Sequence, residues 1–299
     1  MQEKIPQFLY EMLLKQYGET LTNRIIEGYT KQRLVTLRVN TIKAEKERIK
    51  EELTKNGIKF KEVEWNENAL IIENVREEEI EKLEIYENGE IYLQSLSSMI
   101  PPIILEPKSG ENILDMAAAP GGKTTQIAAI SNNETMITAC EKNKIRAERL
   151  KYNLDKQGAN RVNVMLQDAR KLDEFFSFDK ILLDAPCSGS GTLNINQNIE
   201  KIFTKELVQR SSKIQEGLLK KAIKILKPGK EMVYSTCSIL TKENEDILKK
   251  VLSKENVEII PISDIQGIPL LPVSIKGTMC VCPTELYEGF FVAKIRKNK

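Results

Sequence analysis

The sequence predicts an α/β protein with a doubly wound parallel sheet that follows a small N-terminal α+β domain. From residue 112 onward, short apolar segments that end at a polar residue alternate with segments of helical periodicity. Before residue 93, helical and strand patterns are mixed in a shorter stretch that is rich in Glu and Lys. We therefore expect two domains, 1–92 and 93–299, which suits a chain of 299 residues at roughly 100–200 residues per domain.

The elements of the small domain follow from their apolar spacing. Its expected helices and strands are a helix over 5–28, a strand over 34–41, a helix at 44–56, and short strands at 60–63 and 70–72. A further helix is expected to begin within residues 95–102 and to lead into the main domain.

Five expected strands of the main domain each stop at a residue that could contact a ligand. Helices are expected in the gaps, for example over 145–157 and 205–226. Ligands bind at the carboxyl ends of the strands in such sheets, so we expect the residues at the five ends to surround one cleft. The strands 113–114, 136–139, 162–166, 180–183 and 232–235 lead to Asp115, Glu141, Asp168, Asp184 and Cys237.

The chain contains no histidine. This excludes Ser-His and Cys-His nucleophile pairs, histidine general bases and most transition-metal sites, and we expect no metal. Chemistry must therefore rely on cysteine, carboxylates, basic residues and a cofactor. The cysteines show no disulfide spacing and are expected to be free thiols: Cys140, Cys187, Cys237, Cys280 and Cys282.

Charge and hydropathy restrict location and partners. The N-terminus lacks a signal-peptide layout and no apolar run reaches the roughly 20 residues that span a bilayer, so we expect a cytoplasmic protein without a membrane partner. The net charge is +2, but residues 201–230 hold nine Lys or Arg against two Glu. This stretch is either a solvated amphipathic helix or a helix that also lines an RNA groove.

A loop of small residues, 115–124, joins the first strand of the main domain to a helix. Its composition lets backbone N–H groups approach a nucleotide or nucleoside closely. Glu141 lies roughly 20 residues further on, where an acidic residue commonly binds ribose hydroxyls. The alternative is a phosphate-binding P-loop at 121–124 with Asp184 near magnesium, but that pattern requires Gly where the chain has Ala117. Stabilisation by adenosylhomocysteine without Mg²⁺, and not by ATP, would separate the two.

Three motifs in order resemble those of a known family. Residues 118–123 (AAPGGK), 184–189 (DAPCSG) and 235–238 (STCS), followed by 243–245 (ENE), are similar to the signature motifs of the RsmB/Sun family of RNA cytosine-5 methyltransferases. The resemblance extends to residues 37–41, 94–99 and 289–293 and covers nearly the whole chain. Departures from the family pattern are Glu141 for the commoner Asp, Ala117 for Cys, and 277–284, which lacks an Arg and a His.

The resemblance implies a class I methyltransferase fold, Rossmann-like, with a small RNA-contacting N-terminal domain. It implies S-adenosyl-L-methionine as cofactor and RNA as partner, ribosomal RNA more than transfer RNA, and we expect a monomer. By motif position Cys237 corresponds to the nucleophile, and Cys187 to the cysteine that helps to release the product. The implied cofactor-binding residues are Ala117, Ala118, Ala119, Pro120, Gly121, Gly122, Lys123, Glu141, Arg146, Asp168 and Asp184.

The chemistry of cytosine methylation suits these residue types. Carbon 5 of cytosine is a poor nucleophile, so a thiolate must add at carbon 6 to activate it. Without histidine, proton transfer after methylation falls to Cys187, Asp184 or water, and Asp184 could also bind the cytosine edge. Two alternatives stay open: the same chemistry on DNA with Cys187 as nucleophile, and a noncatalytic RNA-binding assembly factor, for which the altered segment 280–284 is the hint.

Overall fold

The structure, a computed structural model, describes residues 4–299 and consists of two compact units. Unit 1 contains the chain up to Arg33 together with 183–264 and 268–299, and unit 2 contains 34–182 and 265–267. The chain passes back to unit 1 within strand β8 (Phe178–Asp184). The predicted domain boundary at residues 92/93 falls inside unit 2, and it stays a prediction.

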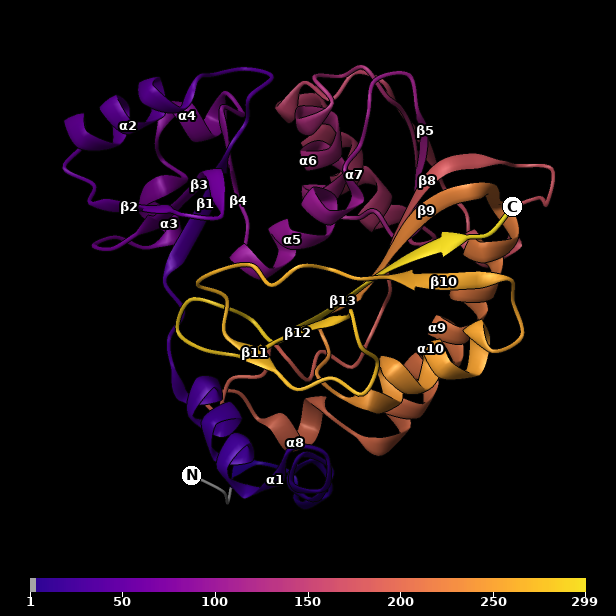
Figure 1. Cartoon of the computed structure of the whole chain (residues 1–299). Coiled ribbons are helices and arrows are strands. Elements are labelled where there is room, and N and C mark those ends of the chain that lie inside the picture. The colour runs from indigo at the N-terminus through magenta and orange to yellow at the C-terminus, as the bar shows by residue number, and fades with distance from the viewer. Residues whose placement is uncertain (1–3) are drawn as a thin grey trace. The chain divides into compact units, whose positions relative to one another are not determined.

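The first part of unit 2 is an antiparallel sheet of order β2-β3-β1-β4 with short helices (Figure 1). Leu37, Ile49, Leu53 and Leu70 are fully buried in its core. The predicted helix at 44–56 and the strands at 34–41, 60–63 and 70–72 are confirmed, whereas β4 was not predicted. The elements are β1 (Val35–Val39), α2 (Lys46–Lys55), β2 (Phe60–Val63), β3 (Asn66–Ile72), α3 (Glu77–Ile80), α4 (Glu84–Glu87) and β4 (Ile91–Leu93).

The rest of unit 2 alternates strands and helices as predicted. Strand β5 pairs in parallel with β6 and with β8, and β6 pairs in parallel with β7. Side-chain caps begin two of the helices: Ser95 accepts from Ser98 N–H in α5, and Asn143 accepts from Arg146 N–H in α7. The elements are α5 (Leu96–Leu105), β5 (Asn112–Asp115), α6 (Gly122–Ile130), β6 (Met136–Cys140), α7 (Lys144–Gln157), β7 (Val162–Met165), η2 (Ala169–Lys171) and β8.

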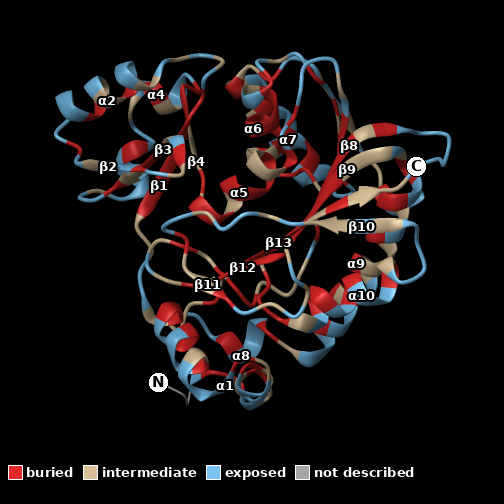
Figure 2. Ribbon diagram, viewed as in Figure 1, coloured by how far each residue is buried: buried red, intermediate tan, exposed pale blue. Residues whose placement is uncertain are grey.

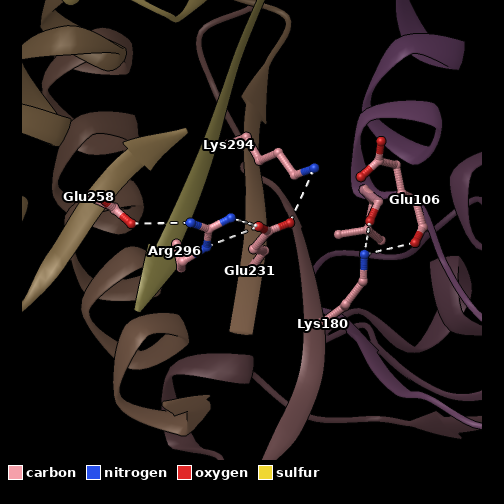
Figure 3. Close-up of polar contacts among 7 residues, drawn as sticks. Glu106, Lys180, Glu231, Glu258, Lys294 and Arg296 are labelled. Carbon is pink, nitrogen blue, oxygen red and sulfur yellow. Dashed lines mark hydrogen bonds and ion pairs between the residues drawn. The ribbon is translucent and has the colours of Figure 1, made fainter. Parts of the chain in front are cut away.

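A buried lysine on β8 holds the end of helix α5 (Figure 3). Lys180 Nζ donates to the carbonyl oxygens of Leu105 at 2.6 Å and Glu106 at 2.7 Å. These carbonyls end the helix and have no partner within it, so the ammonium group satisfies them. The contact fixes α5 against the parallel sheet.

Unit 1 is built on an antiparallel sheet that follows the path β11-β12-β13-β9, with β10 paired to β13. Most strands of this sheet were not predicted, because we expected a purely parallel sheet without β10 to β13. Strand β9 was predicted, but it starts at Leu226 and not at residue 232. Its elements are α1 (Gln7–Thr30), α8 (Ile199–Ile202), α9 (Lys205–Ile225), β9 (Leu226–Thr236), η3 (Thr241–Glu243), α10 (Glu245–Leu252), β10 (Val257–Ile260), β11 (Leu270–Leu271), β12 (Met279–Val281) and β13 (Phe290–Lys297).

Ion pairs join β9 to its partner strand β13. Glu231 lies opposite Arg296 of β13 in the ladder and accepts from its Nη2 at 2.6 Å. Lys294 Nζ lies 3.2 Å from the same carboxylate, and Glu258 of β10 lies 3.3 Å from Arg296 (Figure 3). Ion pairs between opposite strands favour one register, and this ladder reaches back to Glu231, one residue before the predicted strand.

Helices α1 and α9 bury one side each. The predicted helices at 5–28 and 205–226 are confirmed, although Gly18 of α1 has a φ of 73° and interrupts the helical geometry. Figure 2 shows buried strands and helices that carry both buried and exposed residues. The amphipathic character predicted for 201–230 is confirmed, since Leu218, Leu219 and Ile223 are buried while Lys220 and Lys221 are not. Within residues 4–299 no helix is long and apolar enough to cross a membrane.

Candidate functional site

The predicted cofactor loop, residues 117–123, lies in unit 2 between β5 and α6. Its backbone is held from two neighbouring elements. Ala118 N–H donates to Cys140 O of β6 at 2.9 Å, and Arg146 Nη2 of α7 donates to Ala119 O at 2.6 Å. Asn153 Nδ2, also of α7, donates to Pro120 O at 2.8 Å. The loop therefore has a defined shape without a ligand.

The two glycines of the loop are required by packing. Gly121 has a φ of 113°, and a Cβ there would lie 3.0 Å from Leu150 Cδ1 of α7. A Cβ on Gly122 would lie 3.0 Å from Tyr92 Cε1. Only glycine fits these two positions without displacing a neighbour. The absence of a side chain is therefore required by the fold, and it would also allow a ligand to approach the backbone closely.

The acidic residues after β5 and β6 differ in their partners. Asp115 is buried and accepts from Thr124 Oγ1 at 2.7 Å, so it ties β5 to α6. Glu141 is also buried: its Oε1 accepts from Asn143 N–H at 2.8 Å, and its Oε2 lies 3.5 Å from Arg146 Nη1. Because β5 and β6 are parallel and in register, both carboxylates lie at one edge of the sheet. Glu141 retains lone pairs that could accept from hydroxyl groups.

Asp168 lies further from its strand than predicted, since β7 ends at Met165. It caps the short helix η2, and its carboxylate is bound by Arg170 through Nε at 3.0 Å and through Nη2 at 2.5 Å. The hydrogen bonds from Arg170 lower the pKa of Asp168 below its usual value. Asp168 is thus ionised and oriented at the same edge as the end of β6, with which β7 pairs in parallel.

The two motif cysteines meet in unit 1. Cys187 lies in the loop after β8, and Cys237 is the first residue after β9. Their Sγ atoms are 2.9 Å apart, and both residues are half-buried free thiols. The contact with Cys237, followed by burial, raises the pKa of Cys187 well above its usual value. Cys187 therefore remains protonated and can donate its S–H to the sulfur of Cys237.

Asp184 is tied to the same region of unit 1. Its Oδ1 accepts from Ser235 Oγ at 2.8 Å, and the backbone N–H of Ala185 donates to Ser235 O at 2.8 Å. Ser235 lies two residues before Cys237 on β9. The structure thus places Asp184 beside the strand end that carries Cys237, as the prediction of a shared strand-end site requires.

Sequence reasoning missed the residue that joins the two cysteine segments. Glu243 is fully buried and accepts from Ser188 N–H at 2.7 Å, Ser188 Oγ at 2.5 Å and Ser238 Oγ at 2.7 Å. Ser188 follows Cys187 and Ser238 follows Cys237, so one carboxylate holds both loops. Burial raises the pKa of Glu243 above its usual value. The only signal in the sequence was its place in 243–245, which suggested no role.

Further contacts fix the loop that carries Cys237. Gly191 N–H donates to Cys237 O at 2.9 Å, and Thr236 Oγ1 donates to Asn244 Oδ1 at 2.6 Å. Asn244 Nδ2 in turn donates to Ser238 O at 2.8 Å. The backbone carbonyls of Cys237 and Ser238 both accept hydrogen bonds, and these contacts restrict the loop that carries the thiol.

The remaining cysteines are buried and unreactive. Burial raises the pKa of Cys140 to about 12 and that of Cys282 to about 11, and the pKa of Cys280 is raised for the same reason. Cys280 lies in β12, which pairs with β11 and β13. The altered segment 280–284 thus begins in a buried strand and contacts α1, where Tyr17 Oη lies 3.7 Å from Cys280 Sγ.

The parallel strands, the small-residue loop and the acidic strand ends define a class I methyltransferase fold. The chain belongs to the RsmB/F methyltransferase family: residues 102–296 match the family described as 16S rRNA methyltransferase RsmB/F, and residues 5–77 match its RsmF/B-like ferredoxin-like domain. The predicted family is therefore confirmed.

Solved structures agree with this assignment. A methyltransferase homologue from Pyrococcus horikoshii is 34% identical, with a TM-score of 0.82, and the alignment covers 98% of this chain and 100% of that one. NSun6 from the same organism, solved with SFG, is 25% identical with a TM-score of 0.88, and the alignment covers both chains in full. The similarity thus includes both units of the fold.

Curated relatives are longer than this chain. Ribosomal RNA small subunit methyltransferase F of Shewanella sp. (strain MR-7) is 33% identical over 272 residues, which cover 88% of this chain and 56% of the relative. The protein of the same name from Vibrio campbellii is 35% identical over 274 residues, which again cover 88% of this chain and 56% of the relative. The chain therefore spans little more than half the length of these relatives.

Proposed function

We propose that the chain is an S-adenosylmethionine-dependent RNA cytosine-5 methyltransferase that acts through a covalent bond between Cys237 and carbon 6 of the target cytosine. The observation that carries the proposal is the thiol pair of Cys187 and Cys237, 2.9 Å apart and held by Glu243. Two thiols at this distance suit a reaction in which one adds to a substrate and the other transfers a proton.

The residues at the edge of the parallel sheet fit S-adenosylmethionine. Glu141 offers a buried carboxylate to ribose hydroxyls, and residues 117–123 offer a preformed loop at the N-terminus of α6. Arg146 fixes both, because it contacts Ala119 O and Glu141. Asp168 and Asp184 complete the predicted set. The cofactor would supply an electrophilic methyl group, and the related NSun6 structure contains SFG, an analogue of it.

Cys237 begins the reaction as a thiolate that attacks carbon 6 of cytosine. The new S–C6 bond moves the electron pair of the C5–C6 double bond onto carbon 5. Carbon 5 would then bond to the methyl group as the methyl–sulfonium bond of S-adenosylmethionine breaks and S-adenosylhomocysteine leaves. The protonated Cys187 can donate its S–H to the sulfur of Cys237, 2.9 Å away. A target cytosine within a helix would have to leave the base stack to reach this thiol.

Product release requires a proton acceptor at carbon 5 and cleavage of the S–C6 bond. When a base removes the carbon 5 proton, the electron pair restores the C5–C6 double bond and expels Cys237 as thiolate. We assign the protonation of the departing Cys237 sulfur to the S–H of Cys187, with Asp184 or water as the candidate base that removes the carbon 5 proton. Asp184 could alternatively bind the edge of cytosine.

We propose ribosomal RNA as the substrate in preference to transfer RNA, since the relatives are named for the small-subunit ribosomal RNA. Such a substrate is consistent with the predicted cytoplasmic location and with action as a monomer. DNA methylation through Cys187 and a noncatalytic assembly role are the competing outcomes of the test.

The test is methyl transfer in vitro. The protein is incubated with S-adenosylmethionine carrying a labelled methyl group and with a small-subunit ribosomal RNA transcript, a transfer RNA transcript or DNA, and the products are digested to nucleosides. Labelled 5-methylcytidine from RNA supports the proposal. Label in DNA alone supports the DNA alternative, and RNA binding without label supports the assembly factor.

A further inference from the structure

Three lysines of unit 1 surround a pocket that lies apart from the cysteine pair. They come from three elements: Lys15 from α1, Lys205 from the start of α9 and Lys242 from η3. The pocket has a volume of about 340 Å³. Lys15 lies one residue before Gln16, which accepts from Thr241 N–H at 3.0 Å, so α1 is fixed to the chain around Lys242.

Among residues 4–299 the three ammonium groups of this pocket form no ion pair, and Glu11 is the one acidic residue that lines it. Some other exposed lysines of unit 1 do form ion pairs: Lys220 and Lys250 share Glu216, and Lys31 pairs with Glu27. The pocket has excess positive charge, with three lysines against one glutamate.

An aromatic side chain forms part of the wall. Phe8 lines the pocket and stacks on Phe203, with ring centroids 5.8 Å apart and planes inclined by 9°. Lys205 Nζ lies 5.6 Å from the centroid of Phe8. An aromatic face beside unpaired lysines is the combination that single-stranded nucleic acids bind, with phosphates on the cations and bases near the ring.

The pocket is linked to the cysteine site by a short, ordered piece of chain. Lys242 directly precedes Glu243, which holds the loops of both cysteines. Ser212 Oγ of α9 donates to Lys242 O at 3.2 Å, and Gln16 Nε2 of α1 donates to Ile239 O at 2.8 Å. Lys242 is five positions after Cys237, so their Cα atoms lie within about 17 Å of each other.

We propose that Lys15, Lys205 and Lys242, with Phe8, bind the phosphodiester backbone of a single-stranded RNA segment adjoining the target cytosine. The inference rests on the proposed function, because it names the part of the enzyme that holds the RNA near Cys237. It also revises the expectation for residues 201–230: the start of α9 contributes to the RNA site, whereas Lys220 in its middle is already paired with Glu216.

The test compares two triple variants that remove the same charge. Lys15→Gln, Lys205→Gln and Lys242→Gln change the pocket, whereas Lys31→Gln, Lys220→Gln and Lys250→Gln change lysines that are already paired. Binding of a fluorescent single-stranded RNA is measured by anisotropy as a function of salt. We expect the pocket variant to raise Kd about tenfold or more at low salt and to flatten the log–log salt slope by about two.

Equal loss in both variants, or no loss in the pocket variant, would overturn the inference. Thermal unfolding shows whether each variant is folded, and the single variant Lys205→Gln provides a milder version of the test. Methylation separates the two proposals: the pocket variant should raise KM for RNA and leave kcat nearly unchanged. If the parent binds RNA through these lysines but methylates none, the proposed function fails and the RNA site stands.

Discussion

The sulfur atoms of Cys187 and Cys237 lie 2.9 Å apart although 50 residues separate them in the chain. They follow different strands, β8 and β9, and each stands directly before a serine that donates to Glu243. The contact and burial keep Cys187 protonated by raising its pKa. The protonated state of Cys187 fits the proposed division of roles, in which Cys187 donates a proton and Cys237 is the nucleophile.

Substitution of each cysteine should stop the reaction at a different step. Cys237→Ala should abolish methylation and form no covalent complex with RNA, because carbon 5 is never activated. Cys187→Ala should still add and methylate through Cys237 but should release product poorly. We expect a protein–RNA adduct that survives denaturing electrophoresis for Cys187→Ala only.

The double variant provides the control, since removal of Cys237 from the Cys187→Ala protein should eliminate the adduct. An adduct that forms with Cys237→Ala and disappears with Cys187→Ala would assign the nucleophile to Cys187, as in the DNA alternative. Normal turnover in both single variants would exclude covalent catalysis by these residues.

The sequence could predict those parts of the fold that depend on local patterns. The alternation of apolar segments and helices indicated β5, β6, β7 and β8 and their parallel pairing, and these are confirmed. Strands β10 to β13 were missed, because the prediction relied on an alternation of strands and helices, and no helix lies between these four strands within residues 257–297. Glu243 was missed because its role depends on a contact with Ser188, 55 positions away, which no local pattern indicates.

Glu243 should be important for stability as well as for the position of the cysteines. Glu243→Ala leaves Ser188 and Ser238 without a buried acceptor, and we expect it to lower the free energy of unfolding by about 2–4 kcal/mol. Glu243→Gln keeps the size and one acceptor and should cost about 1 kcal/mol. Chemical denaturation measures both changes. Equal small effects would mean that the carboxylate does not hold the loops.

The raised pKa of Glu243 predicts a pH dependence of stability. Between the usual carboxyl pKa of 4.5 and its higher folded value, the native state binds more protons than the unfolded state. The contribution of Glu243 to the free energy of unfolding is thus fully present below 4.5 and is lost as pH rises through the folded pKa. Glu243→Gln should remove this decline. A parent and variant with parallel stability profiles would contradict the prediction.

The acidic residues at the edge of the parallel sheet should affect the cofactor and not RNA. Glu141→Ala and Asp168→Ala should each weaken binding of S-adenosylmethionine, because we expect these carboxylates to face its adenosine portion. Their affinity for RNA should stay nearly unchanged. Isothermal titration measures the first and anisotropy the second, and parent-like binding of the cofactor by both variants would mean that the cofactor site is misplaced.

Arg146 should act on the cofactor site through the loop that it holds. Its Nη2 donates to Ala119 O at 2.6 Å, and its Nη1 lies 3.5 Å from Glu141, so Arg146→Ala releases both the loop and the carboxylate. We expect a loss of cofactor affinity of about tenfold, since hydrogen bonds to charged groups contribute about 1.5–3 kcal/mol and water replaces part of this.

Arg149 is the matched control for this prediction, because it is an exposed arginine on the same helix, α7. Arg149→Ala removes the same charge and should leave cofactor binding unchanged. If the loss for Arg146→Ala were only the loss of a distant positive charge, the two variants would weaken binding equally, and added salt would reduce the difference from the parent. If Arg146 instead positions the loop, Arg146→Ala should lose cofactor affinity even at high salt, whereas Arg149→Ala should not. The reason is that in Arg146→Ala the loop 117–123 must become ordered when the cofactor binds, which costs binding free energy.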